Sequence, residues 1–182
     1  MIEKNFLEKL LKNECLTIDE ADGLLSAIAS NQINEMMAAG ILIALRMKGE
    51  HANEVTGFSK AMRRLSIDPE IHIQEKTIDI VGTGGDGSKS LNLSTGSALL
   101  AAACGLKVIK HGNRSISSSS GSADVLEKLG FPISQAPSKN QKILETIGFT
   151  FLFAPNYHPA MKSIAPIRKS LRTRTIFNIL GP

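Results

Sequence analysis

From residue 78 onward, short β-branched segments alternate with segments of helical spacing, and this alternation is the strongest constraint on the fold. Strands are predicted over Ile78–Val81, Lys107–Lys110, Phe149–Phe153 and Thr175–Leu180. The helices predicted between them cover Thr95–Cys104, Ser122–Leu129, a segment that begins at Ser138 with Gln141 completing a capping box, and Pro159–Leu171. Such alternation is typical of α/β domains. We therefore expect a mainly parallel sheet flanked by helices.

Residues 3–66 show only helical spacing. A capping box, Thr17-Ile-Asp-Glu20, is predicted to begin the second helix, and Asn31 is expected to cap the third. Pro69 interrupts the helical pattern. The expected organisation is a helical domain over 1–66, a linker over 67–77 and an α/β domain over 78–182.

Composition excludes several classes of protein. Aromatic residues make up 4% of the chain and Trp is absent, so the core is aliphatic and stacking platforms for single-stranded nucleic acid are not expected. No apolar run approaches the roughly 20 residues that span a bilayer, and the charged N-terminus is unlike a secretory signal. Cys15 and Cys104 lie in apolar stretches and are expected to be reduced core thiols of a cytoplasmic protein.

The positive charge is concentrated in the second part of the chain. Residues 1–66 hold 8 Lys/Arg against 9 Asp/Glu, whereas residues 67–182 hold 13 against 8. A basic segment suits an acidic ligand such as a phosphate ester. Nucleic acid fits less well, because the Lys and Arg residues are dispersed.

A glycine-rich segment, Val81-Gly-Thr-Gly-Gly-Asp-Gly87, directly follows the first predicted strand. Four glycines in six positions let backbone N–H groups approach an anion closely. Ser94 and Thr95 then add hydroxyl groups where a helix begins, and helix N-termini attract phosphate. No Gly-Lys-Ser/Thr follows, and the helix begins too late for a dinucleotide fingerprint. The segment therefore predicts phosphate binding of another kind, although a plain turn remains an alternative.

Two further groups of polar residues follow predicted strands, where α/β sheets bind ligands. Lys110-His-Gly-Asn113-Arg114 offers cations and an amide, and the serine-rich segment after it has the composition of a flexible linker. His158 follows the third strand, and Arg168 can hold a carboxylate bidentately. The residues of both groups could also have purely structural roles. No Cys/His metal spacing or nucleophilic triad is present, so a metal would be Mg²⁺ carried by a phosphorylated substrate.

Six motifs resemble those of anthranilate phosphoribosyltransferase and occur in the same order: GTGGD, NLST, KHGNR, SGSADVLEKLG, HPAMK and RTIFNILGP. The resemblance covers about Ile78 to Pro182, and the helical start also fits that family. It implies a nucleoside phosphorylase/phosphoribosyltransferase-like fold and a cytoplasmic homodimer formed through the N-terminal helices. The implied reaction belongs to tryptophan biosynthesis: with Mg²⁺, the amine of anthranilate displaces pyrophosphate from phosphoribosyl pyrophosphate (PRPP).

The resemblance also implies site residues. PRPP would contact Gly82, Thr83, Gly85, Asp86, Ser90, Asn92, Ser94, Thr95, Lys110, Ser118 and Ser122, and Ser94 would ligate Mg²⁺. Anthranilate would contact Gly82, Asn113, His158 and Arg168, with Arg168 at its carboxylate. No covalent nucleophile is required, because N–H groups and Mg²⁺ can stabilise the departing pyrophosphate.

Two departures from the family pattern affect these expectations. Ser119 stands where the family usually has Lys, which removes a positive charge from the loop. The family's acidic Asp-Glu pair for a second Mg²⁺ would come after Pro182, so we expect a partial sheet and weak activity of these residues alone. The alternatives are a pyrimidine nucleoside phosphorylase-like enzyme, which the KHGNR motif disfavours, and a non-catalytic fragment that binds nucleic acid or a partner.

Overall fold

The computed structural model describes residues 2–82, 91–114 and 120–181. The chain forms two compact units. Unit 1 comprises Met1–Ser66 and His158–Pro182, and unit 2 comprises Ile67–Tyr157. The first break, after Ser66, coincides with the expected end of the helical domain, whereas residues 158–182 group with the N-terminal helices and not with the α/β domain expected over 78–182.

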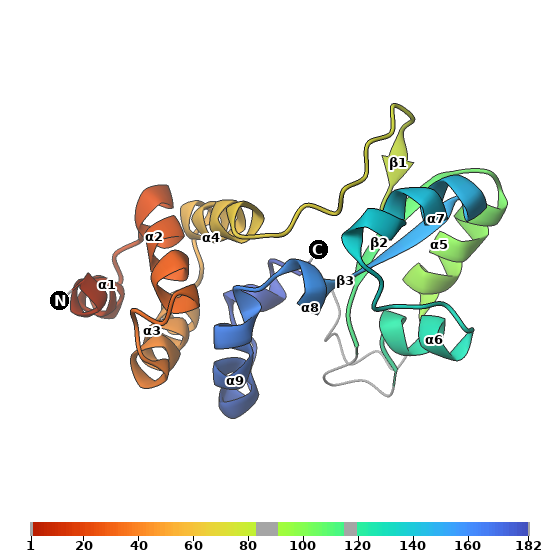
Figure 1. Cartoon of the computed structure of the whole chain (residues 1–182). Coiled ribbons are helices and arrows are strands. Elements are labelled where there is room, and N and C mark those ends of the chain that lie inside the picture. The colour runs from red at the N-terminus through yellow and green to blue at the C-terminus, as the bar shows by residue number, and fades with distance from the viewer. Residues whose placement is uncertain (1, 83–90, 115–119, 182) are drawn as a thin grey trace. The chain divides into compact units, whose positions relative to one another are not determined.

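Unit 1 is helical (Figure 1). Its elements are α1 (Ile2–Leu11), α2 (Ile18–Ala29), α3 (Glu35–Lys48), α4 (Ala52–Arg64), α9 (Met161–Leu171) and the 3₁₀ helix η2 (Ile176–Asn178). One apolar core joins these elements, with Leu25, Ile41 and Phe58 from the N-terminal helices packed in the same cluster as Ile164 and Phe177. Burial of these side chains stabilises the unit, because it removes apolar surface from water.

The capping box at Thr17 is confirmed, since the Thr17 side chain accepts from the Glu20 N–H and Glu20 accepts from the Thr17 N–H. The predicted cap of the third helix is wrong by three residues. Asn34 caps α3 and accepts a hydrogen bond of 2.9 Å from the Met37 N–H. Asn31 has a φ of 58°, the left-handed conformation in which Asn commonly ends a helix, and it closely follows α2.

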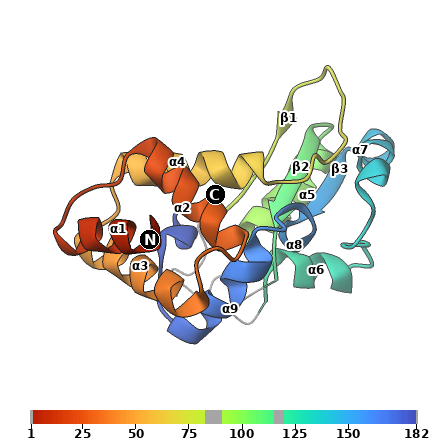
Figure 2. The same ribbon diagram turned by 60° about the vertical axis from the view of Figure 1, so that its left-hand side comes forward.

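Unit 2 is the α/β unit. It contains β1 (Thr77–Ile78), α5 (Leu93–Ala103), β2 (Lys107–Gly112), α6 (Ser122–Lys128), η1 (Pro137–Lys139), α7 (Asn140–Ile147), β3 (Phe149–Phe153) and α8 (Ala154–Tyr157). The strands pair in parallel in the order β1-β2-β3, with Val108 opposite Phe149 and Gly112 opposite Phe153. Figures 1 and 2 show the strands side by side with helices around them. The predicted parallel pairing is confirmed.

Alternating side chains of the sheet have different neighbours. Val108, Phe149 and Phe151 belong to one buried cluster with Ala98 of α5 and Leu126 of α6. Thr150, which points the opposite way from Phe149 and Phe151, hydrogen-bonds to α7. Both sides of β3 are therefore covered by helices, as parallel sheets require.

Three further sequence predictions were wrong. Thr175–Leu180 is not a fourth strand, because Ile176 and Phe177 are buried in the helical core of unit 1 and form η2. The helix expected from Ser138 begins at Asn140, after the turn η1 and without a side-chain cap. Cys15 and Cys104 are free but exposed, since they lie beside helix ends. Among the described residues, no helix is both long and apolar enough to cross a membrane.

Substitution at Gly57 tests the packing of α2 against α4. A Cβ atom there would lie 2.3 Å from the Ile18 carbonyl oxygen and 2.6 Å from the Ala21 Cβ. Gly57→Ala should lower the free energy of unfolding by about 1–3 kcal/mol, measured with urea, because backbone atoms cannot move aside cheaply.

Gly23→Ala in α2 is the matched control, since no atom lies within 4 Å of its added Cβ. It should raise the free energy of unfolding by about 0.5–1 kcal/mol. If Gly57→Ala were as stable as Gly23→Ala, the close packing of α4 against α2 at Gly57 would be contradicted.

Candidate functional site

β1 pairs in parallel with the start of β2, with Ile78 opposite Val108, so the residues that follow both strands run toward the same edge of the sheet. Gly82 follows β1, and a Cβ atom built on it would lie 3.8 Å from the Ser94 Oγ. Ser94 belongs to the first turn of α5. The structure therefore brings the start of the glycine-rich segment to the N-terminus of this helix, as a phosphate site requires.

The first turn of α5 keeps polar groups for a ligand. Asn92 is the N-cap residue, but its side chain makes no capping bond and donates instead to the Ser120 carbonyl at 3.2 Å. The Thr95 side chain is buried, and among the described residues its hydroxyl oxygen has no partner. Because the first N–H groups of a helix also lack intrahelical acceptors, this end can bind an anion.

Lys110 is buried, with 2% of its surface exposed. Its ammonium group donates a hydrogen bond of 2.6 Å to the Ile80 carbonyl, two residues before Gly82. Burial lowers the pKa of Lys110, and the negative charge of Asp79 opposes that shift. Lys110 therefore links β2 by a hydrogen bond to the backbone that precedes the glycine-rich segment.

Gly112 allows a close approach between β2 and the start of α6. A Cβ atom on Gly112 would lie 2.3 Å from the Ser122 Oγ and 2.8 Å from a ring carbon of Phe151. The next residue, Asn113, accepts hydrogen bonds on its carbonyl oxygen from the Ser122 hydroxyl and the Ala123 N–H, both at 3.2 Å. Ser122 and the backbone of Asn113 are thus held together.

Arg114 is held by α6. It forms ion pairs of 2.9 Å with Asp124 and Glu127, and its guanidinium carbon lies 5.9 Å from the centre of the Phe153 ring. These carboxylates raise the pKa of Arg114 further above its usual value. The structure therefore neutralises a cation that the sequence offers to a ligand.

Arg168 differs from Arg114 in its surroundings. It is half-buried on α9 in unit 1, with its guanidinium carbon 5.7 Å from the centre of the Phe177 ring. Among the residues that the structure describes, no Asp or Glu forms an ion pair with it. Burial lowers the pKa of Arg168 but leaves it charged. This arrangement suits a carboxylate ligand.

The expected site residues divide between the two units. The described PRPP residues are all in unit 2: Gly82, Asn92, Ser94, Thr95, Lys110 and Ser122. The anthranilate residues come from both, Gly82 and Asn113 from unit 2 and the half-buried His158 together with Arg168 from unit 1. Thr83, Gly85, Asp86, Ser90, Ser118 and Ser119 lie outside the described residues.

No group of three or more His, Cys, Asp or Glu side chains is placed to hold a metal ion within residues 2–82, 91–114 and 120–181. Ser94 offers one hydroxyl oxygen beside Gly82. Mg²⁺ commonly takes one or two protein oxygens together with substrate phosphates and water. Ser94 therefore fits an ion that arrives with a phosphorylated substrate.

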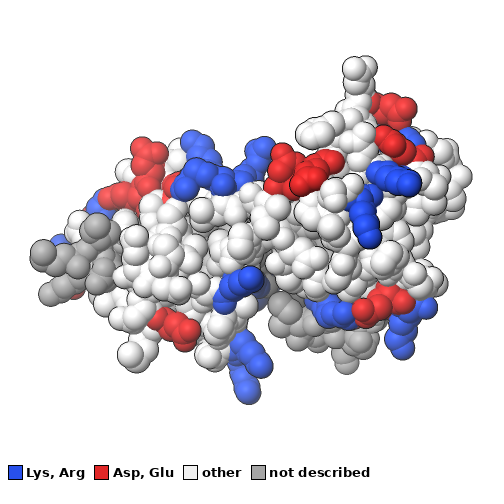
Figure 3. Space-filling view, in the orientation of Figure 1, with Lys and Arg blue, Asp and Glu red and all other residues white. Residues whose placement is uncertain are grey.

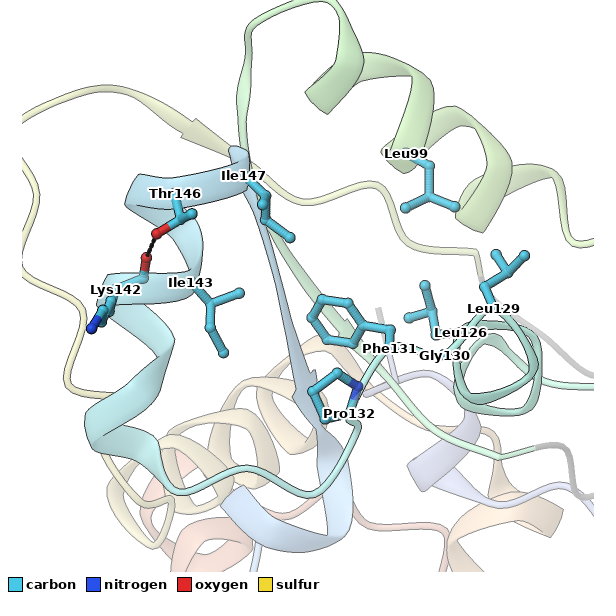
Figure 4. Close-up of a pocket in the computed structure, with 10 residues that line it drawn as sticks. All are labelled: Leu99, Leu126, Leu129, Gly130, Phe131, Pro132, Lys142, Ile143, Thr146 and Ile147. Atoms are coloured by element: carbon cyan, nitrogen blue, oxygen red, sulfur yellow. Dashed lines mark hydrogen bonds between the residues drawn. The ribbon is translucent and has the colours of Figure 1, made fainter.

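An apolar pocket of about 530 Å³ lies elsewhere in unit 2, between α5, α6 and α7. Leu99, Leu126, Phe131 and Ile143 point toward one another across it (Figure 4). None of the expected site residues lines this pocket. The pocket is therefore apolar and separate from the candidate site.

Sequence reasoning missed the two partners of Arg114. Asp124 and Glu127 are three residues apart, so they lie on one face of α6. Their spacing was visible in the sequence, but only the fold places Arg114 beside that face. The close approach at Gly112 had no sequence signal beyond a glycine between a strand and a loop.

Two models of one protein family match this chain. The helical bundle domain of the glycosyl transferase family matches residues 4–66, and its a/b domain matches residues 74–182. The chain therefore belongs to this glycosyl transferase family.

Individual relatives show which members of this family the chain resembles. Anthranilate phosphoribosyltransferase from Thermoanaerobacter sp. (strain X514) is 51% identical over 176 residues, which cover 97% of this chain and 52% of that protein. The structure of anthranilate phosphoribosyltransferase from Thermus thermophilus has a TM-score of 0.88 at 44% identity, covering 97% of this chain and 54% of the other.

The Saccharomyces cerevisiae enzyme of the same name, in complex with PRPP and Mg, has a TM-score of 0.87 at 31% identity, covering 99% of this chain and 54% of that one. This chain therefore spans about half the length of the relatives that it matches.

The bond from Lys110 to Ile80 can be tested by substitution. Lys110→Met keeps an unbranched side chain of similar size but leaves the Ile80 carbonyl without its donor. The free energy of unfolding, measured with urea in the absence of ligands, should fall by about 1–3 kcal/mol. Lys128→Met, at an exposed position of α6, is the control and should change it by less than about 0.5 kcal/mol. Equal values for the two variants would show that the bond contributes little.

Proposed function

We propose that the protein transfers the phosphoribosyl group of PRPP to the amine of anthranilate and releases pyrophosphate. The observation that carries this proposal is the first turn of α5, which keeps the Thr95 hydroxyl without a partner among the described residues and lies beside Gly82. A helix N-terminus with free donors next to a glycine suits the phosphates of PRPP. The relatives named anthranilate phosphoribosyltransferase support the same assignment.

In this proposal, the residues bind and orient substrates and do not form covalent bonds with them. Ser94, Thr95 and the N–H groups of the α5 first turn hold the phosphates, and negative charge grows there as pyrophosphate departs. Preorganised donors stabilise such charge without reorganising in the transition state. Mg²⁺, with Ser94 as a ligand, supplies further positive charge.

Anthranilate would be oriented by its carboxylate. Arg168 is half-buried and has no carboxylate partner among the described residues, so it can bind that group bidentately. Asn113 and His158 would contact the same substrate. Binding of the carboxylate directs the amine, which is the nucleophile, and correct orientation is a large part of catalysis.

The alternatives fit these observations less well. Pyrimidine nucleosides carry no carboxylate, so a nucleoside phosphorylase would not require Arg168 to bind one. Nucleic acid binding would need a continuous basic surface, whereas Lys/Arg and Asp/Glu are interspersed on the face shown in Figure 3. Arg114, in addition, is already paired with two carboxylates.

The direct test is an assay of the protein as its gene encodes it. Formation of phosphoribosyl anthranilate from anthranilate, PRPP and Mg²⁺ is the expected result. Phosphorolysis of pyrimidine nucleosides in place of this reaction would overturn the proposal in favour of the first alternative. Salt-dependent DNA binding without either activity would favour the second.

We also propose that the protein is a homodimer that associates through α3. Met36, Gly40, Ile43 and Met47 follow one another at helical spacing. Met36 and Met47 are 85% and 83% exposed, and Gly40 has open space around it. A stripe of exposed apolar side chains with a glycine suits close contact with a second copy.

Arg168→Ala should raise the KM for anthranilate by about 10- to 100-fold, because a charge-assisted contact to the carboxylate is lost. The KM for PRPP should change by less than about threefold. The neighbouring exposed residue supplies the control, Lys169→Ala, which should leave both constants unchanged. A similar rise in both KM values would count against this role of Arg168.

Met36→Glu and Met47→Glu, combined in one variant, should convert a dimer into a monomer, since buried like charges would face each other. Light scattering after size-exclusion chromatography measures the mass. Leu129→Glu, at another exposed apolar position, should leave the mass unchanged. If the α3 variant keeps the mass of the unaltered protein, α3 is not the dimer contact.

A further inference from the structure

Ser122 begins α6, and several contacts hold it at the end of β2. A Cβ atom on Gly112 would lie 2.3 Å from the Ser122 Oγ, and the Asn113 carbonyl accepts from the Ser122 hydroxyl at 3.2 Å. The Asn113 carbonyl also accepts from the Ala123 N–H at 3.2 Å. The position of the Ser122 hydroxyl, which the resemblance assigns to PRPP, therefore depends on how the start of α6 is held against β2.

The carboxylate of Asp124 is bonded to both flanks of this contact. One oxygen accepts from the Gly121 N–H at 2.7 Å, and Gly121 immediately precedes Ser122. The other oxygen accepts from the Arg114 guanidinium at 2.9 Å, and Arg114 immediately follows Asn113. One side chain, which is 28% exposed, therefore joins the segment that follows β2 to the residue that precedes α6.

Arg114 is itself fixed by further groups. It donates two hydrogen bonds to the Glu127 carboxylate, at 2.9 and 3.0 Å, and its guanidinium carbon lies 5.9 Å from the centre of the Phe153 ring. Isolated exposed ion pairs contribute little to stability, but a bidentate pair within a network holds a defined geometry. Arg114, Asp124 and Glu127 form such a network, which we call the α6 clamp.

The N-terminus of α5 is bonded to the same region. The Asn92 amide donates to the Ser120 carbonyl at 3.2 Å, and Ser120 immediately precedes Gly121. Asn92 is the N-cap residue of α5, whose first turn is the proposed phosphate site. The α6 clamp and the described residues assigned to PRPP belong to unit 2. The contacts that place Ser122 and the first turn of α5 therefore lie within one compact unit.

We infer that Asp124 is a positioning residue for PRPP, which through Gly121 and Arg114 holds the Ser122 hydroxyl in place for the substrate. The inference rests on the proposed function. Asp124 does not need to touch PRPP for this role, because its two oxygens are bonded to Gly121 and Arg114. A carboxylate beside a phosphate site repels the substrate, and the ion pair with Arg114 reduces that repulsion.

The sign of the effect separates positioning from simple charge repulsion. If charge alone matters, removal of a carboxylate near bound phosphates should strengthen PRPP binding. If Asp124 positions Ser122, the same removal should weaken PRPP binding, because the start of α6 is then held less firmly against β2. The two explanations therefore predict opposite changes in the Kd for PRPP.

Asp124→Ala is the principal variant, and Asp124→Asn keeps an acceptor for the Gly121 N–H. In the protein as its gene encodes it, Asp124→Ala should raise the Kd for PRPP by about tenfold, measured by calorimetry with Mg²⁺. Asp124→Asn should raise it by about threefold, because only the charge in the contact with Arg114 is lost. An unchanged or lower Kd in Asp124→Ala would overturn the inference.

Two controls each remove a carboxylate elsewhere. Glu127→Gln makes the same change of charge on the same helix and with the same partner, Arg114. Glu20→Ala removes an equivalent group in unit 1, since Glu20 completes the capping box of α2 and pairs with Lys9 at 2.7 Å. Both controls should keep the Kd for PRPP within about twofold. A tenfold rise in either would overturn the inference, because charge or stability alone would then explain the effect of Asp124.

A second measurement does not require PRPP. The Ala123 N–H donates to the Asn113 carbonyl, and none of the variants removes either group. Hydrogen exchange of this N–H, followed by NMR, should become about tenfold faster in Asp124→Ala and stay within about twofold in Glu127→Gln and Glu20→Ala. Unaltered exchange in Asp124→Ala would overturn the inference, because the start of α6 would then be held without the α6 clamp.

Failure of the proposed function is distinguishable from failure of the inference. No binding of PRPP by the unaltered protein would overturn the proposed function and, with it, positioning for PRPP, whereas the exchange of Ala123 would still decide whether Asp124 holds the start of α6. If the unaltered protein forms phosphoribosyl anthranilate but Asp124→Ala binds PRPP as tightly, the proposed function stands and the inference is wrong.

Discussion

The parallel pairing of β2 with β3 is the contact on which the rest of the candidate site depends. It runs from Val108 opposite Phe149 to Gly112 opposite Phe153. Burial of Val108, Phe149 and their neighbours against α5 and α6 secures the pairing, and β1 adds to the other edge of β2. Because the strands are parallel, the residues that follow β1 and β2 emerge at the same edge of the sheet. This places Gly82 and Asn113 in one region of unit 2.

Whether a Lys or Arg side chain can bind a ligand depends on the groups with which it is already paired. Lys110 is buried against a carbonyl and supports the backbone before Gly82, and Arg114 is paired with Asp124 and Glu127. Arg168 has an aromatic neighbour but no carboxylate partner among the described residues. A guanidinium that is partly desolvated and unpaired gains the most from an incoming carboxylate. In the proposed function, the cation that binds the anthranilate carboxylate is therefore the one on α9.

Sequence patterns predicted those elements whose signal is local. Phe149–Phe153 and the capping box at Thr17 were predicted to the residue, because a β-branched and aromatic run or a cap depends on near neighbours. Thr175–Leu180 was wrongly predicted as a strand, since a short segment with four apolar residues out of six suits a strand or a buried turn equally well. The core that received Ile176 and Phe177 is built largely from residues more than 100 positions away. No local sequence pattern could therefore predict that Ile176 and Phe177 join this core.

The sequence by itself determined the helical and α/β parts of the chain, the parallel pairing of the strands, and the glycine, hydroxyl and cationic groups that resemble those of a phosphoribosyltransferase. These follow from spacing and residue type, which are properties of short segments. Only the tertiary structure decided that residues 158–182 pack with the N-terminal helices, that Arg114 is neutralised while Arg168 is not, and that the buried Asn140 amide bonds to both Pro69 and Tyr157. The physical reason is that burial and ion pairing depend on which distant segments meet, and the pairing of Asn140 with Pro69 spans 71 residues.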